Sequence, residues 1–179
     1  MAEYLSEHFT LEELTYSDTA KAKGINNKPT ALHKKILKHT AQYLLEKVRT
    51  LLNEKYKTYQ RKKVKYVALR ITSGYRCEKL NVEVGGSNTS QHCNGSACDV
   101  EAVIVFNNGS KTVLPYTELY ADIKQWTKEK KISVDQCIQE CTRDSQWVHI
   151  SHHPSGRTCD RRMFLIYSKG MYRLDCDLD

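Results

Sequence analysis

The sequence predicts an α+β fold, with helices first and a small, mainly antiparallel sheet after them. In the first third of the chain, apolar residues recur at three- and four-residue steps, as they do on one face of a helix. Later segments alternate apolar and polar residues, which is typical of half-buried strands. The 179 residues are enough for one domain with a hydrophobic core and too few for two comfortable ones. We therefore expect a single compact domain, with an N-terminal helical arm over residues 1–30, a core over 31–170 and a tail over 171–179.

Two helices are predicted before the first strand. Thr10 and Glu13 have the spacing of a capping box, so a short helix should begin at Thr10. After a loop, Thr30 can cap a long helix that runs from Ala31 to about Tyr56. The apolar stripe of that helix should face the core, and it consists of Leu32, Ile36, Leu37, Tyr43, Leu44, Val48, Leu51 and Leu52.

The remaining elements are predicted from alternation, helical periodicity and turn residues. Ser73-Gly74 ends the first strand, Gly85-Gly86 ends a short helix, and Asn107-Asn108-Gly109 closes a hairpin. In chain order, we expect a strand over Val64–Thr72, a helix over Glu78–Val84, a strand over Ala97–Phe106 with Val113 paired back on it, a helix over Tyr116–Glu129, and strands over Val134–Glu140, Gln146–His152 and Met163–Tyr167.

Composition and charge narrow the class of protein. Lys and Arg outnumber Asp and Glu by 28 to 21, and the net charge of +7 suits a polyanionic partner such as a nucleic acid or an anionic cell wall. No aromatic–basic platform or helix-turn-helix pattern supports nucleic-acid binding, and we interpret the basic run Lys55–Lys65 as a solvated helix end and loop. No apolar run approaches the ~18 residues of a membrane span. We expect a monomer that binds neither nucleic acid nor membrane.

The cysteines are expected to be reduced thiols. Their number is odd, and the polar N-terminus lacks the charged start and apolar core of a secretory signal peptide. No Cys-x-x-Cys pair is present, so the sequence does not support a structural zinc knuckle. The cysteines are Cys77, Cys93, Cys98, Cys137, Cys141, Cys159 and Cys176.

A histidine and an aspartate stand at the start of the strand predicted over Ala97–Phe106. His92 and Asp99 lie seven residues apart and bracket Gly95 and Ala97. A loop that ends in a strand can fold His92 back toward Asp99, and the two small residues permit the close backbone approach that this requires. Both side chains are good zinc ligands.

The segment Gln146–Ser151 offers a third ligand. Alternation sends Val148 and Ile150 to one face of this strand and Trp147 and His149 to the other, so His149 should face away from the core. Taken singly, a histidine is more often a surface residue or a hydrogen-bonded core residue. Two histidines and an aspartate with a fourth position open to water are nevertheless the layout of a catalytic zinc, whereas structural zinc sites are usually closed by four protein ligands.

The sequence resembles the zinc D-alanyl-D-alanine carboxypeptidase family in the pattern Ser90-x-His92-x-x-Gly95-x-Ala97-x-Asp99 followed by Trp147-Val148-His149. That family also contains phage endolysin peptidases and vancomycin-resistance dipeptidases. Three further stretches are similar to a phage and bacterial branch of it: Leu5–Phe9 through Pro29-Thr30, Ile71–Arg76, and Leu80-Asn81 with Val84–Ser87. The resemblance spans residues 5–153. It implies the α+β fold shared with the hedgehog signalling domain, and a zinc ion bound by His92, Asp99 and His149.

A peptidase also needs a general base, and here the sequence departs from the family pattern. Much of the family has Glu or Asp three residues before the second histidine, where this chain has Gln146, which cannot take a proton. The branch that the chain resembles has an Asp-Gln-Leu-Ile-x-Glu strand. Residues 135–140 reproduce it with Cys137 for Leu, which implies Glu140 as the base. Asp144 is the alternative, but it falls in a hairpin turn, where Asp is common for turn reasons alone.

The same resemblance implies that Arg76 holds the substrate carbonyl or a carboxylate near the metal, as a planar guanidinium does well. A surface role for Arg76 is the alternative. Other polar residues near the motifs are expected to support the site or its turns (Ser73, Tyr75, Ser90 and Gln91) or to be exposed loop histidines (His152 and His153).

Two cysteines flank the predicted ligands, although neither matches a ligand position. On a strand, Cys98 and Asp99 point to opposite faces, so Cys98 should be a buried, small apolar residue. Cys93 lies in a loop, where an exposed or half-exposed free thiol is expected.

The leading hypothesis is a zinc peptidase that cuts peptidoglycan stem peptides at a bond involving a D-amino acid. Because the sequence shows no signal peptide and leaves no room for a separate wall-binding module, we expect a phage lysin released from the host cytoplasm or a virion-borne enzyme. A D,D-dipeptidase or carboxypeptidase is the alternative among enzymes. From another class, a non-catalytic domain on the same fold could bind zinc and wall peptide.

Overall fold

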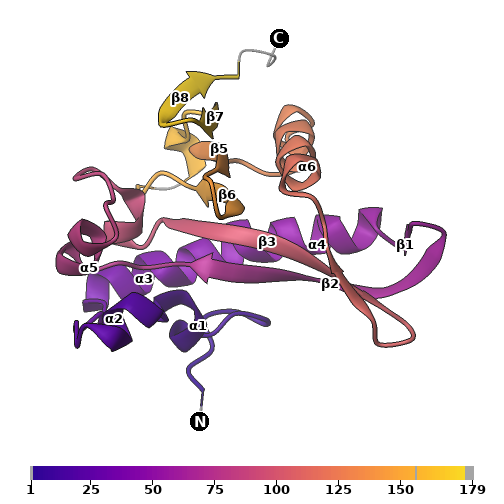
Figure 1. Cartoon of the computed structure of the whole chain (residues 1–179). Coiled ribbons are helices and arrows are strands. Elements are labelled where there is room, and N and C mark those ends of the chain that lie inside the picture. Colours follow the sequence, from indigo (N-terminus) through magenta and orange to yellow (C-terminus); the bar gives the residue numbers. More distant parts are fainter. Residues whose placement is uncertain (1, 156, 176–179) are drawn as a thin grey trace.

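A single sheet runs through the molecule, and the computed structural model describes it over residues 2–155 and 157–175 (Figure 1). Its strands are β1 (Thr58–Tyr59), β2 (Lys62–Ser73), β3 (Ala97–Phe106), β4 (Lys111–Val113), β5 (Gln136–Cys141), β6 (Gln146–Ser151), β7 (Met163–Ser168) and β8 (Met171–Leu174). They lie in the order β1-β2-β3-β6-β5-β7-β8, with β4 beside β3. All described strand pairs are antiparallel except β5–β7, which are parallel. The predicted α+β class and mainly antiparallel sheet are confirmed.

The helices begin where capping residues predict. Thr10 Oγ1 accepts a hydrogen bond from the Glu13 amide, and Thr30 Oγ1 accepts one from the His33 amide, both at 3.2 Å. The described helices are α1 (Leu11–Thr15), α2 (Asp18–Ala22), α3 (Ala31–Thr40), α4 (Glu46–Lys55), α5 (Glu78–Glu83) and α6 (Tyr116–Lys128), with a π-helical turn η1 (Ala41–Leu45) and the 3₁₀ turns η2 (Gln91–Asn94) and η3 (Arg157–Cys159). The long helix predicted from residue 31 is therefore α3, η1 and α4 in succession.

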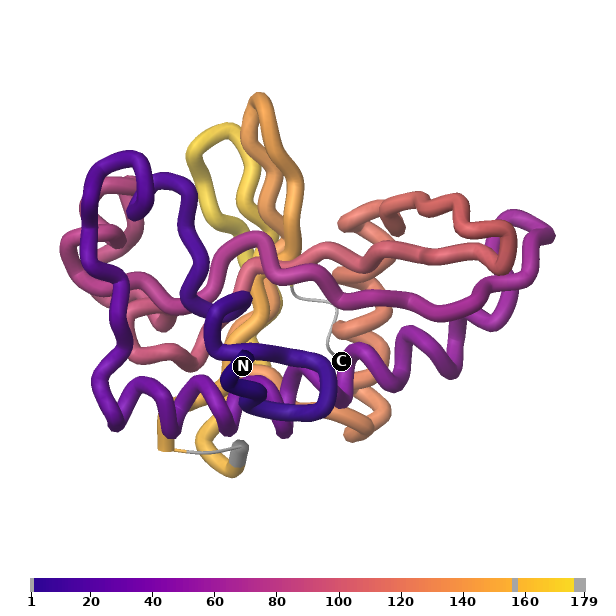
Figure 2. The backbone as a smooth tube through the Cα atoms, turned by 90° about the horizontal axis from the view of Figure 1, so that it is seen from below, coloured from indigo at the N-terminus to yellow at the C-terminus, as the bar shows by residue number. Residues whose placement is uncertain are grey.

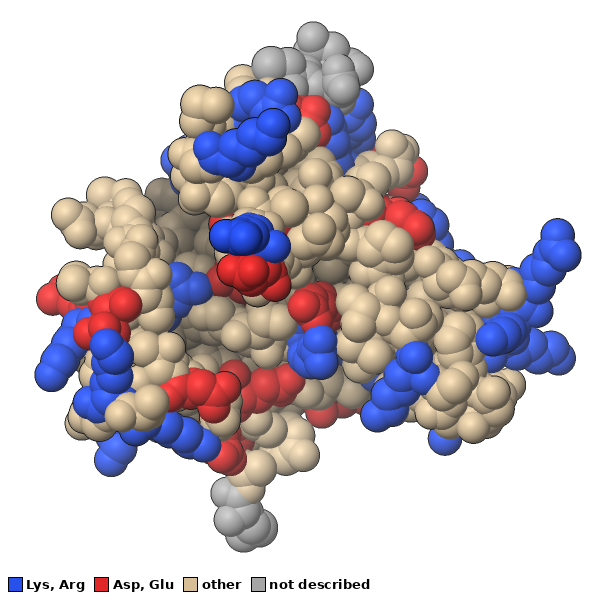
Figure 3. Space-filling model, viewed as in Figure 1, with Lys and Arg blue, Asp and Glu red and all other residues tan. Residues whose placement is uncertain are grey.

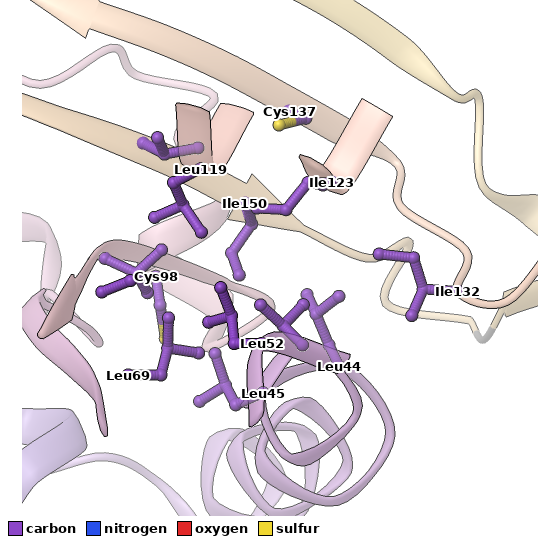
Figure 4. Packing of buried hydrophobic residues seen from close by; sticks show 14 of the residues in the cluster. Leu44, Leu45, Leu52, Leu69, Cys98, Leu119, Ile123, Ile132, Cys137 and Ile150 are labelled. Atoms are coloured by element: carbon purple, nitrogen blue, oxygen red, sulfur yellow. The ribbon is translucent and has the colours of Figure 1, made fainter. Parts of the chain in front are cut away.

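The long helix packs one face against the sheet. Figure 2 shows it spanning the molecule, with the N-terminal segment lying against it, where the His8 amide donates to Glu46. In Figure 4, Leu44, Leu45 and Leu52 of the helix meet core residues of the sheet and of α6. The prediction that the whole stripe faces the core is wrong for two residues. Leu32 and Tyr43 are 64% and 46% exposed, because the helix turns those positions away from the sheet.

The basic run after α4 forms the β1–β2 hairpin at one end of the molecule. All six of its basic side chains are exposed, as predicted: Lys55, Lys57, Arg61, Lys62, Lys63 and Lys65. One of them, Lys55, also forms an ion pair with the buried carboxylate of Asp122. Lys and Arg side chains gather over this end of the surface (right side of Figure 3).

The C-terminal segment departs from the prediction of a tail. Residues 171–174 form strand β8, which pairs with β7, while residues 176–179, including Cys176, lie outside the described part of the chain. The short α2, capped by Ser17, was also not predicted. Among the described residues, no helix is both long and apolar enough to cross a lipid bilayer.

Candidate metal-dependent active site

Three side chains meet at the middle of the sheet. The antiparallel register places His149 of β6 directly opposite Asp99 of β3, and η2 brings His92 over the same point. His92 Nε2 lies 3.2 Å from Asp99 Oδ1 and 3.2 Å from His149 Nδ1, and His149 Nδ1 lies 3.0 Å from Asp99 Oδ1. All three residues are buried, with exposed fractions of 3–6%. The structure thus brings together the three residues that the sequence singled out as ligands.

Two glycines hold His92 in place. Gly95 ends η2 with φ +85°, a conformation that favours glycine, and a Cβ there would lie 2.9 Å from Leu37 Cγ of α3. The close backbone approach expected at Gly95 is therefore an approach to helix α3. Gly74, after β2, accepts a hydrogen bond from His92 Nδ1 at 2.7 Å. Because Nδ1 donates this bond, Nε2 is the ring nitrogen that faces Asp99 and His149.

Asp99 is held as an anion. Its Oδ2 accepts a hydrogen bond from the Arg76 guanidinium at 2.7 Å, which leaves Oδ1 facing the two histidines. Burial by itself raises the pKa of Asp99, but the charge of His92 and the hydrogen bonds from His149 and His92 outweigh burial and hold the pKa well below its usual range. Arg76 Nε also donates to Ser73 Oγ at 2.9 Å, so Ser73 supports the site as expected.

Arg76→Ala should weaken zinc binding about 10–100-fold, because residues that orient a ligand contribute on this scale. Competition with a chelating dye measures the affinity. Arg70→Ala is the matched control. Arg70 of β2, like Arg76, forms an ion pair with a carboxylate of β3, that of Glu101, but Arg70 does not line the cleft. Lost activity with unchanged zinc affinity would contradict the orienting role and leave Arg76 only its predicted contact with substrate.

A cleft of about 720 Å³ opens above the three residues. One wall is the loop after α5, from Val84 to Gln91, and the other is formed by β5, β7 and β8. Figure 3 shows the hollow between these two parts of the surface. Two imidazole nitrogens and one carboxylate oxygen lie within 4.8 Å of one another on its floor. This donor set suits zinc, and the open cleft leaves space for water and substrate beside it.

The predicted base lies on the same face of the sheet. Glu140 of β5 pairs with Trp147 of β6, two residues from His149, so the register places Glu140 diagonally across from His149. Burial, followed by the charge of Asp99, raises the pKa of Glu140 to about 7. Asp144 lies exposed in the turn between the strands and does not line the cleft. The geometry therefore favours Glu140 over Asp144.

A second ion pair beside the cleft was not recognised in the sequence. Asp135 is fully buried and accepts hydrogen bonds from Arg161 Nε and Nη2 and from Gln91 Nε2. Burial raises the pKa of Asp135, but the hydrogen bonds from Arg161 outweigh it, so the pKa is lowered. Gln91 also accepts a hydrogen bond from Ser151 Oγ at 2.8 Å. This network ties η2 to β6, and it confirms the supporting position expected of Gln91.

His152 contradicts the expectation of an exposed loop histidine. It is 2% exposed, its Nε2 lies 2.7 Å from Thr40 Oγ1, and its Nδ1 lies 2.8 Å from the His153 carbonyl oxygen. The physical reason is that α3 passes beneath the end of β6 and covers this ring. His153 is half-buried.

The two cysteines near the ligands lie as predicted. Cys98 is fully buried on the face of β3 opposite Asp99, and Cys93 is half-buried. Burial raises the pKa of both thiols, and neither sulfur belongs to the group of described side chains that could hold a metal ion. The double variant Cys93→Ser, Cys98→Ala should therefore retain its bound metal, as metal analysis would show. Zinc lost together with the sulfurs would contradict a catalytic site and indicate a structural one.

Comparison with known protein families identifies the family to which the chain belongs. The Peptidase M15 family matches residues 7–151, which include all three clustered side chains, Arg76 and Glu140. A comparison with curated proteins gives no match. The match covers most of the chain. Peptidases of this family depend on a metal ion, which agrees with the buried His-Asp-His cluster. The chain belongs to the peptidase M15 family of metallopeptidases.

Proposed function

We propose that this chain is a zinc-dependent peptidase that hydrolyses peptidoglycan stem peptides at a bond involving a D-amino acid. The observation that carries the proposal is the convergence of His92, Asp99 and His149 on the floor of an open cleft, with Glu140 on the same sheet face. Membership of the M15 family supports peptide hydrolysis. Among such peptidases, we propose the endopeptidase or D,D-carboxypeptidase type.

The metal would be held by His92 Nε2, Asp99 Oδ1 and His149 Nδ1, the three atoms that face one another. A bound zinc ion supplies a Lewis acid that polarises the scissile carbonyl and makes water acidic enough to lose a proton near neutral pH. Gly74 fixes the proton of His92 on Nδ1, and Arg76 occupies the second oxygen of Asp99. These contacts hold the ligand atoms in place before substrate binds.

Glu140 is the proton carrier in this proposal. Its carboxylate takes a proton from the attacking water and passes it to the nitrogen of the departing amine. A pKa near 7 suits both steps, because the group can bind and release a proton at neutral pH. Gln146, at the position where the family often has an acid, is exposed at the start of β6 and cannot serve.

The setting that we propose is a phage lysin released from the host cytoplasm or a virion-associated wall hydrolase. The exposed basic side chains of the β1–β2 hairpin support it, because they would concentrate the protein on an anionic wall. We propose that the chain acts as a monomer on the peptidoglycan stem peptide, without nucleic acid or membrane as partners.

Digestion of purified peptidoglycan tests the activity. Mass spectrometry of the products should show new termini at a bond next to a D-amino acid, and a chelator should prevent them. Zinc added in slight excess should restore cleavage. Binding of zinc and wall material without any new terminus would instead favour a non-catalytic domain.

A further inference from the structure

The C-terminal hairpin builds one wall of the cleft although it lies outside the residues matched by the family. The match ends at residue 151, whereas β7 and β8 span residues 163–174. Leu165, Tyr167 and Tyr172 of this hairpin line the cleft. This part of the wall therefore lies outside the residues that the family match covers.

The strand pairings show that the sheet face that holds the site continues across the β7–β8 hairpin. Glu140 pairs with Tyr167, and Tyr167 pairs in turn with Tyr172. Because directly opposite residues in a sheet share a face, both tyrosines stand on the face that holds Glu140 and His149. Strands are spaced by about 4.8 Å, so Tyr172 lies roughly 10 Å from Glu140, at the mouth of the cleft.

The two rings form an open aromatic surface. Their centroids lie 4.6 Å apart with an angle of 43° between the ring planes, and Tyr172 is 58% exposed. Leu165 and Ile138 continue the apolar strip toward the metal site. Aromatic faces carry negative charge density that attracts C–H groups, and the phenol hydroxyls can bond to polar substituents around them.

We infer that Tyr167 and Tyr172 form a subsite for an N-acetylated sugar ring of the glycan to which the stem peptide is attached. This inference rests on the proposed function. Amino acids of stem peptides are small, such as alanine, or charged, such as glutamate and the diamino acids. The sugar is the component of peptidoglycan that presents a flat C–H face with polar groups at its rim, which is the shape that an exposed tyrosine pair accepts.

Titration with the soluble N-acetylglucosamine tetramer, followed by nuclear magnetic resonance of the full-length chain, tests the subsite without hydrolysis. Tyr172→Ala should raise the dissociation constant about tenfold, the scale of an aromatic contact together with its buried area. Tyr172→Phe keeps the ring and should retain most of the binding. Met171→Ala is the matched control, because Met171 is 63% exposed on the opposite face of the same strand. Equal binding by wild type and Tyr172→Ala, or no binding by wild type, overturns the inference.

Hydrolysis kinetics show whether the sugar or the peptide of the substrate contacts the two tyrosines. Tyr172→Ala should raise KM about tenfold for a disaccharide-linked stem peptide and leave KM for the free stem peptide unchanged. An equal rise for both substrates would assign the tyrosines to the peptide and overturn the sugar subsite. If the wild type cleaves neither substrate, the proposed function fails, and the sugar titration still decides the subsite.

Discussion

His149→Ala is expected to abolish both stoichiometric zinc binding and hydrolysis. His149 Nδ1 lies within 3.2 Å of both other ligand atoms, so its loss leaves only His92 and Asp99 to hold the ion. Changes to residues that merely orient a ligand cost about 10–100-fold in affinity, and removal of a ligand should cost more. Plasma mass spectrometry of the purified protein measures the metal, and release of new peptide termini measures activity.

His153→Ala is the matched control for this substitution. His153 lies on the same stretch of chain, is half-buried, and does not line the cleft. It should keep wild-type zinc content and turnover. Circular dichroism of both variants separates loss of metal from loss of fold. A folded His149→Ala protein that retains one zinc per chain would refute the ligand set.

Most of the sheet could be predicted because its strands have local sequence signals. Alternation and the turn at Asn107-Asn108-Gly109 gave the bounds of β3, Ala97–Phe106, as the structure has them. Strand β6 was predicted one residue too long, to His152, where the chain leaves the sheet. The facing of His149 away from the apolar side of its strand followed from the period of two.

What the sequence could not predict depends on partners far along the chain. Arg161 lies 26 residues from Asp135, and Thr40 lies 112 residues from His152, so neither contact leaves a local pattern. Strand β8 is short and its residues are exposed, so it lacks the alternation that predicts a half-buried strand. The position of Glu140 beside His149 likewise depends on the β5–β6 register, which only the folded sheet shows.

Glu140→Gln should keep zinc and fold but reduce turnover by about 100-fold or more, the scale of a general base. Glutamine has nearly the shape of glutamate, and the Glu140 side chain is not among the three atoms that face the metal position, so the ligands stay in place. The amide cannot accept a proton from water or return one to the leaving amine. Single-turnover kinetics on a stem peptide, with zinc content measured on the same sample, separate the proton-transfer step from metal loss.

Asp144→Asn decides between the two candidate bases. Asp144 is exposed in the β5–β6 turn, whereas Glu140 stands on the site face of β5 and lines the cleft. The variant should therefore turn over substrate at close to the wild-type rate. If Asp144→Asn loses activity while Glu140→Gln keeps it, the turn must fold over the cleft when substrate binds, and the base is Asp144. If both variants remain active, neither carboxylate moves the proton. The exposed Gln146 cannot replace them, because an amide cannot take a proton from water.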